Sequence, residues 1–198
     1  MFCVTEKGLI TVRYAKMKNK LTLGSLFDGS GCFCLAAKNV NITPVWLSEI
    51  EPFCLRVTEK RLHEVKQYGD IRNLDGKKLE PVDIITGSSP CQDVSISGKR
   101  TGLSGSQSGL FFEMIRIISE MRKKTGYPRY VVWENVPGVF SSQKGDDFRR
   151  VIEEFVKIKY NVPIPKPEKW KHAGFILGDN FSIAWRVLNS QFFGGLSD

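Results

Sequence analysis

Short runs of β-branched and apolar residues alternate along this chain with segments whose apolar residues recur at helical spacing. Glycine or an acidic residue follows most of these runs. Such alternation is typical of a parallel sheet with helices on both faces, so we expect an α/β fold with a doubly wound, mostly parallel sheet. The expected strands are 21–27, 43–48, 67–71, 82–86 and 130–133, and the expected helices are 34–38, 52–65, 109–122 and 148–156.

The region after the last expected helix has a different composition. Asn161 to Lys171 contains three prolines and predicts an extended surface connection, because proline interrupts both helices and central strands. Regular structure is expected to resume between Phe181 and Phe193.

The overall composition sets limits on the class of protein. With 198 residues, 41% of them hydrophobic, the chain can form one sizeable core. Its five cysteines lack the spacing of a disulfide framework, and Cys32 and Cys34 have no second cysteine or histidine pair to complete a zinc site. We therefore expect reduced thiols, no metal, and a cytoplasmic protein, since neither a membrane-spanning run nor a signal peptide is evident.

The basic charge is concentrated at the N-terminus. The net charge of +8 suits a polyanionic partner, but residues 1–20 carry five lysines or arginines against one glutamate. We expect residues 1–20 to form a disordered basic extension, and residues 21–198 to form the folded domain.

A cysteine follows a proline within the glycine- and serine-rich stretch from Gly87 to Gly102. This stretch comes directly after the expected strand 82–86, so Cys91 lies beyond the carboxyl end of a strand, where open α/β sheets bind ligands. Cys91 is thus a candidate nucleophile. The alternative is an ordinary buried cysteine, since cysteine is among the most buried residue types.

A glycine-rich turn follows the first expected strand. Gly29 and Gly31 allow a tight turn and a close approach of the backbone to a ligand. Glu49 stands 20 residues after Gly29, at the tip of the next expected strand, where nucleotide-type cofactors have their ribose hydroxyls held. A solvated loop glutamate is the alternative interpretation of Glu49.

Taken in order, these segments resemble the motifs of the DNA cytosine-5 methyltransferases, a family that uses S-adenosylmethionine. The resemblance covers roughly residues 21–194 and keeps the family's motif order, which makes it more specific than any single motif. It implies the Rossmann-like methyltransferase fold, incomplete at the C-terminus. The matching segments are 26–31, 49–50, 70–71, 89–92, 108–111, 134–136 and 184–189.

The resemblance implies roles for individual residues. Glu49 would bind the cofactor's ribose, Ile50 would lie against its adenine, and Asp70 with Ile71 would meet the adenine edge. Residues implied to bind the cofactor are Phe27, Gly29, Gly31, Glu49, Ile50, Asp70, Ile71, Pro90 and Leu110. Cys91 is implied to add to C6 of a flipped cytosine while Glu134 holds its N3 and exocyclic amine. Residues implied to contact double-stranded DNA are Gln92, Ser95, Lys99, Arg100 and Asn135.

The chain also departs from the family's pattern. Cys32 and Cys34 stand where many members have glycine and another small or loop residue, and after Gly194 the expected Pro-Gln-Arg-Arg motif and target-recognition region are missing. The first hypothesis is therefore a truncated or split methyltransferase, partnered by double-stranded DNA and by a separate C-terminal recognition fragment. The alternatives are a non-catalytic cofactor- or DNA-binding remnant and, last, a nicotinamide-dependent oxidoreductase suggested only by Gly29, Gly31 and Glu49.

Overall fold

A computed structural model of the chain describes residues 20–89 and 109–193. Strands and helices alternate through its first five strands, as the sequence predicts. The strands are β1 (Thr22–Leu26), β2 (Thr43–Ser48), β3 (Lys66–Gln67), β4 (Ile84–Gly87), β5 (Tyr130–Trp133), β6 (Ala173–Gly178) and β7 (Phe181–Arg186). The α-helices are α1 (Cys32–Asn39), α2 (Pro52–Arg61), α3 (Leu110–Thr125) and α4 (Asp146–Lys157).

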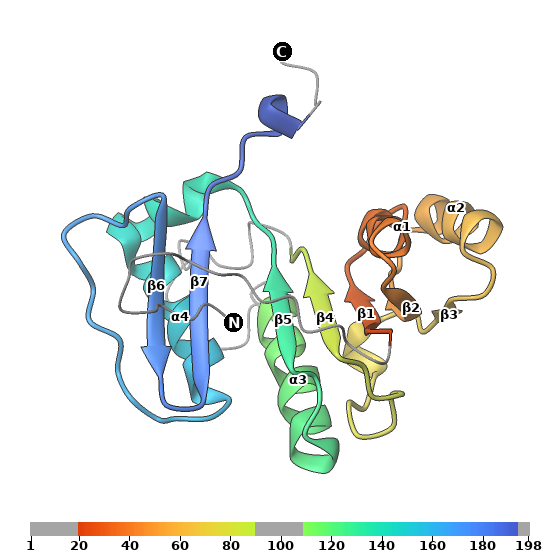
Figure 1. The fold of residues 1–198 in the computed structure, drawn as a ribbon, viewed down its shortest axis with the longest axis horizontal. Coiled ribbons are helices and arrows are strands. Elements are labelled where there is room, and N and C mark those ends of the chain that lie inside the picture. The colour runs from red at the N-terminus through yellow and green to blue at the C-terminus, as the bar shows by residue number, and fades with distance from the viewer. Residues whose placement is uncertain (1–19, 90–108, 194–198) are drawn as a thin grey trace, which may run out of the picture.

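The first five strands form one parallel sheet in the order β3-β2-β1-β4-β5 (Figure 1). Leu26, the last residue of β1, pairs with Ser48 of β2 on one side and with Gly87 of β4 on the other. Gly87 in turn pairs with Trp133, the last residue of β5. Four strands therefore end level with one another, and the doubly wound parallel sheet predicted from the sequence is confirmed.

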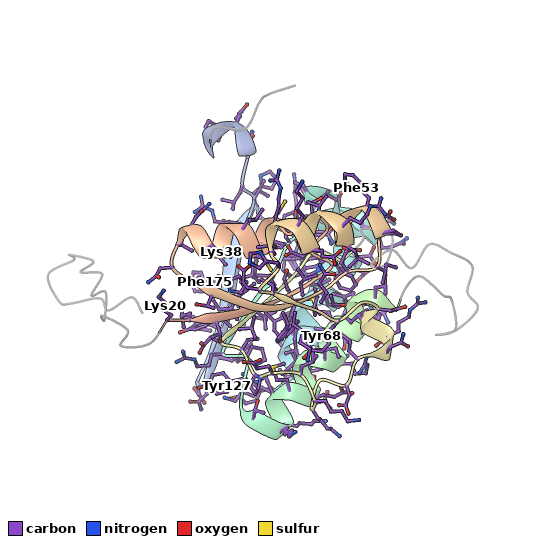
Figure 2. All side chains as sticks on the ribbon, turned by 90° about the vertical axis from the view of Figure 1, so that its right-hand side faces the viewer. Lys20, Lys38, Phe53, Tyr68, Tyr127 and Phe175 are labelled. Atoms are coloured by element: carbon purple, nitrogen blue, oxygen red, sulfur yellow. The ribbon has the colours of Figure 1, made fainter. Side chains whose placement is uncertain are left out.

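Helices cover both faces of this sheet. Figure 2 shows α1 and α2 along one face and α3 along the other. The α1/α2 face has a core that includes Leu23, Leu47 and Leu62, whereas α3 packs its apolar stripe against the opposite face. Five residues expected at helical spacing are buried in α3, namely Phe111, Met114, Ile115, Ile118 and Met121, and Ile117 is buried beside them. Leu110, which was also expected in this stripe, is only partly buried.

The last two strands form a separate antiparallel hairpin beyond β5 (Figure 1). Trp185 of β7 packs edge-on against Phe148 of α4 and against Trp170, so a second aromatic core joins the hairpin to this helix. The chain between Tyr160 and Lys171 forms no helix or strand, as its prolines predicted. Strand β6 was not predicted, because it begins right after that segment and its alternation is irregular.

Two expected elements end several residues earlier than predicted. The strand expected over 67–71 consists only of Lys66–Gln67, because Gly69 takes a left-handed conformation (φ 70°) and ends the extended segment. Asp70 then accepts a hydrogen bond from the Arg72 amide and begins a short 3-10 helix at Ile71–Asn73. The helix expected to reach residue 65 ends at Arg61. Across the described residues, no helix has the length and apolarity that crossing a membrane requires.

Candidate functional site

The candidate residues gather at the carboxyl edge of the parallel sheet. The strand order reverses between β1 and β4, and in open α/β sheets ligands bind outside the strand ends at such a point. The glycine turn follows β1 and Ser88 follows β4 at this central position. Glu49 follows β2 and Glu134 follows β5, so carboxylates flank the centre on both sides.

The turn after β1 has an unusual backbone. Phe27 has a positive φ of 57°, which is rare for a bulky residue and is found mainly where the surroundings impose it. Gly29 also has a positive φ, and a Cβ there would meet no atom of the described chain within 4 Å, so the turn exposes its backbone to open space. At Gly31, which has φ 88°, a Cβ would lie only 2.5 Å from the Leu62 side chain. Gly29 is therefore needed for its backbone conformation, and Gly31 is needed both for its conformation and for the close packing of Leu62.

A buried aspartate caps the helix that follows this turn. Asp28 is 5% exposed, and its carboxylate accepts hydrogen bonds from the amides of Phe33 (2.9 Å) and Cys34 (3.3 Å). Burial raises the pKa of Asp28 above its ordinary value, although hydrogen bonds from Cys34 and Phe33 oppose this change. Asp28 was not among the residues predicted to have a role, although an aspartate shortly before a helix is a recognised capping signal.

The Asp28 cap bears on the kind of cofactor. Dinucleotide-binding proteins leave the amides at this helix N-terminus free to hold a pyrophosphate. Here a carboxylate already accepts from two of them, and it would repel a phosphate group. The site is therefore suited to a cofactor without a pyrophosphate, which argues against the nicotinamide-dependent alternative.

The two cysteines of α1 lie in different surroundings. Cys32 is exposed at the start of the helix, whereas Cys34 is fully buried. Burial raises the pKa of the Cys34 thiol, and the neighbouring Asp28 carboxylate raises it further. Cys34 is thus an unreactive core residue.

Glu49 joins the glycine turn to the start of α2. One carboxylate oxygen accepts from the Gly29 amide at 2.9 Å. The other accepts from the amides of Ile50 (2.7 Å) and Glu51 (2.9 Å). These three bonds fix the carboxylate beside the turn. The neighbouring residue Ile50 is 58% exposed and offers an apolar surface on which a flat ring could pack.

Asp70 and Ile71 lie on the segment that follows β3. The Arg72 guanidinium donates to both carboxylate oxygens of Asp70, at 3.0 Å from Nε and 2.6 Å from Nη2. These bonds hold the pKa of Asp70 below its ordinary value. The Ile71 side chain is buried in the core beneath α3, with 3% exposure.

Arg116 of α3 binds the backbone of the segment that follows Asp70. Its guanidinium donates to the backbone oxygens of Leu74 (2.8 Å) and Ile71 (3.1 Å). Glu113 and Glu120 on the same helix pair with it, one turn before and one turn after. Sequence reasoning did not single out Arg116, because its backbone partners are more than 40 residues away.

Hydrogen bonds connect the residues that follow β4 with those at the end of β5. The Glu134 amide donates to the Gly87 oxygen at 3.0 Å, and the Ser88 hydroxyl donates to the Glu134 carboxylate. The Trp133 indole donates to the Ser89 hydroxyl at 3.0 Å, and the Asn135 side-chain amide donates to the Ser89 oxygen at 3.2 Å. Leu110, at the start of α3, packs partly buried against the main core.

Several predicted residues fall outside the part of the chain that the structure describes, namely Pro90, Cys91, Gln92, Ser95, Lys99 and Arg100. The same holds for residues 1–19 of the expected N-terminal extension. Within residues 20–89 and 109–193, no three His, Cys, Asp or Glu side chains are grouped so that they could hold a metal ion.

Comparisons with known proteins agree with this architecture. The sequence model of the family described as C-5 cytosine-specific DNA methylase matches residues 21–195. An orphan methyltransferase of Bacillus phage rho11s, M.Rho11sI, is 33% identical over 150 residues, which are 74% of this chain and 29% of that protein. A protein of Escherichia phage P1 named as a DNA N-6-adenine-methyltransferase is 30% identical over 205 residues, which span 88% of this chain and 27% of its own length.

A solved structure has the same fold. The S. pombe Dnmt2 methyltransferase superposes with a TM-score of 0.54 at 22% identity, covering 68% of this chain and 42% of its own. The chain spans less than a third of the length of either phage relative.

Proposed function

This chain belongs to the C-5 cytosine-specific DNA methylase family, and from that premise we propose that it forms the cofactor-binding and catalytic part of a DNA cytosine-5 methyltransferase. The observation that carries the proposal is the meeting of the glycine turn, Glu49 and Glu134 at one carboxyl edge. The methyl donor is S-adenosylmethionine and the acceptor is C5 of a cytosine in double-stranded DNA.

The residues at the edge fit this cofactor. The open space beside Gly29 accommodates a ligand against the backbone, and Phe27 with Gly31 shapes that turn. Glu49 accepts from the ribose hydroxyls, since a carboxylate has lone pairs left beside its backbone donors. The exposed Ile50 packs against the adenine. Asp70 receives the adenine amino group, and Ile71, whose side chain is buried in the core, meets the adenine edge through its backbone. Pro90 and Leu110 are assigned to the apolar lining.

The chain's own residues supply the activation of the base. S-adenosylmethionine, when bound, supplies an electrophilic methyl group, but C5 of cytosine is too poor a nucleophile to accept it unaided. The Cys91 thiolate adds to C6, and Glu134 holds N3 and the exocyclic amine so that negative charge does not accumulate on the ring. Loss of the C5 proton after methylation re-forms the double bond and expels Cys91 as a thiolate.

The DNA partner follows from the same chemistry. C6 of a stacked cytosine cannot be reached, so the base must leave the duplex at a cost of a few kcal/mol. We assign contacts with the DNA to Gln92, Ser95 and Asn135, and contacts with its phosphates to Lys99 and Arg100. We assign reading of a target sequence to a separate C-terminal recognition fragment, because this chain spans less than a third of the length of either phage relative.

The test is transfer of a labelled methyl group from S-adenosylmethionine to duplex DNA by the full chain, alone and with the C-terminal part of a relative. Nucleoside analysis of the product should show 5-methylcytosine, and N6-methyladenine would overturn the assignment of the base. Cys91→Ser should abolish transfer and leave cofactor affinity nearly unchanged. Cofactor binding without transfer in either mixture would favour the non-catalytic alternative.

A further inference from the structure

Glu134 is exposed, yet its backbone is tightly placed. It is the first residue after β5. Its backbone N–H donates a hydrogen bond to the Gly87 oxygen, which continues the pairing of β5 with β4 for one more residue. Its side chain extends toward β4, where the Ser88 hydroxyl donates to Oε2. Among the described residues, this hydroxyl is the only donor to the Glu134 carboxylate.

The residue next to Ser88 is held independently. Ser89 is 3% exposed, and it accepts from the Trp133 indole through its hydroxyl and from the Asn135 side chain through its backbone oxygen. The Trp133 ring in turn packs edge-on against Phe111 of α3, with ring centres 5.7 Å apart. Ser88 is therefore presented to Glu134 by a backbone that is fixed on both sides.

We propose that Ser88 is a positioning residue that orients the Glu134 carboxylate for the target base. This inference rests on the proposed role of Glu134 and extends it. An exposed glutamate samples many rotamers, and a hydroxyl bond to Oε2 selects those that point over the end of β4. One donated bond leaves Oε1 and the remaining lone pair of Oε2 to accept from the exocyclic amine and from N3 once N3 carries a proton.

The position of Ser88 in the chain gives the bond a further consequence. Ser88 stands three residues before Cys91 in the same segment. The hydroxyl bond therefore ties the residue proposed to hold the base to the segment that carries the proposed nucleophile. The proposed reaction requires Glu134 at N3 and Cys91 at C6 of the same base, so both side chains must be oriented relative to that base.

A purely structural role for Ser88 predicts different behaviour. The Ser88 hydroxyl has no described partner besides Glu134, whereas the anchoring of this edge depends on Ser89, Trp133 and the backbone bond at Gly87. Removal of the Ser88 hydroxyl should therefore leave the fold intact and release only the Glu134 side chain.

The first experiment observes the side chain directly and needs no activity. In the full chain labelled with ¹³C-glutamate, the Glu134 carboxylate signal is identified by its loss in Glu134→Gln. Ser88→Ala should move this signal to the position of glutamates that have no protein hydrogen-bond donor, and Ser88→Thr should return it to the wild-type position. Ser141→Ala is the matched control, because Ser141 is an exposed serine whose hydroxyl donates, within residues 20–89 and 109–193, only to the Gly138 oxygen at 3.2 Å. An unchanged Glu134 signal in Ser88→Ala would overturn the proposal.

The second experiment measures methyl transfer to duplex DNA in a single turnover. Ser88→Ala should lower the rate about tenfold, as expected for the loss of a hydrogen bond to a charged group, with unchanged affinity for S-adenosylmethionine. The same substitution in a Glu134→Gln background should cause little further loss, because the group it positions is already altered. Equal losses in both backgrounds would mean that Ser88 acts elsewhere. If the wild-type chain transfers no methyl group, that result counts against the proposed function, and the carboxylate signal alone decides the role of Ser88.

Discussion

The Gly29 amide donates to the Glu49 carboxylate over 2.9 Å, so one hydrogen bond connects the turn after β1 with the end of β2. Because the other oxygen of Glu49 binds the amides of Ile50 and Glu51, this side chain both shapes the turn and presents a carboxylate beside it. Its structural role and its proposed role in binding ribose therefore coincide.

Replacement of Glu49 should weaken cofactor binding. Glu49→Ala should lower the affinity for S-adenosylmethionine by about tenfold or more, since each hydrogen bond to a charged group contributes about 1.5 to 3 kcal/mol. Isothermal titration calorimetry measures the change. Glu51→Ala, which removes a neighbouring exposed carboxylate, should bind as the wild type does. Unchanged affinity in Glu49→Ala would refute the ribose role.

Asp28 should contribute to folding through its cap on α1. Asp28→Ala leaves the amides of Phe33 and Cys34 without their acceptor, and should lower the free energy of unfolding by about 1 to 2 kcal/mol. Asp28→Asn keeps an acceptor oxygen and should lose less. Urea unfolding followed by circular dichroism measures both variants, and equal stability of Asp28→Ala and the wild type would contradict the capping role.

Arg116 should matter to cofactor binding although it lies beneath the site. Arg116→Ala frees the backbone of Ile71 and Leu74, and should weaken binding of S-adenosylmethionine together with thermal stability. Arg116→Lys should recover little, because an ammonium cannot reproduce the fork that reaches two carbonyl groups.

Arg149 of α4 provides the matched control for Arg116. It makes the same kind of paired contacts on its helix, with Asp146 one turn before and Glu153 one turn after. Arg149→Ala should lower stability and leave cofactor affinity unchanged. If both alanine variants lower affinity equally, the effect is global and not a consequence of the segment after Asp70.

Asp83 should make stability depend on pH. It lies just before β4, at the amino ends of the strands and away from the candidate site. Its carboxylate accepts hydrogen bonds from the amide (2.9 Å) and hydroxyl (3.0 Å) of Thr22 and from Arg129. Burial opposes ionisation of Asp83, but these donors outweigh it and hold its pKa below the ordinary 3.8.

A lowered pKa stabilises the fold only while the carboxyl is ionised. The contribution of Asp83 is therefore fully present above pH 3.8 and disappears as the pH falls through the lower pKa of the folded state. Asp83→Asn should lower the free energy of unfolding by about 1 to 3 kcal/mol at pH 7, and the difference from the wild type should shrink below pH 3.8. Chemical unfolding at a series of pH values measures it, and a constant difference would contradict this account.

The sequence by itself determined the class of fold and the residues that follow each strand. β-branched runs and helical periodicity are local properties, so they located β1, β2, β4, β5 and the stripe of α3 without knowledge of the fold. Glu49 was identified for the same reason, since a residue just past a parallel strand lies at the carboxyl edge whatever the strand order. Glu134 was identified through the resemblance to the family's motif.

Only the tertiary structure decided which of these strand ends are neighbours. The order β3-β2-β1-β4-β5 puts the glycine turn beside Ser88, and it joins residues that are 20 or 46 positions apart in the bonds Gly29 to Glu49 and Ser88 to Glu134. The hydrogen bonds from Arg116 to the segment after Asp70, and the packing of the β6–β7 hairpin against α4, could not be predicted from the sequence either. Long-range hydrogen bonds and aromatic packing depend on how finished elements fit together, and no local pattern of residues encodes that fit.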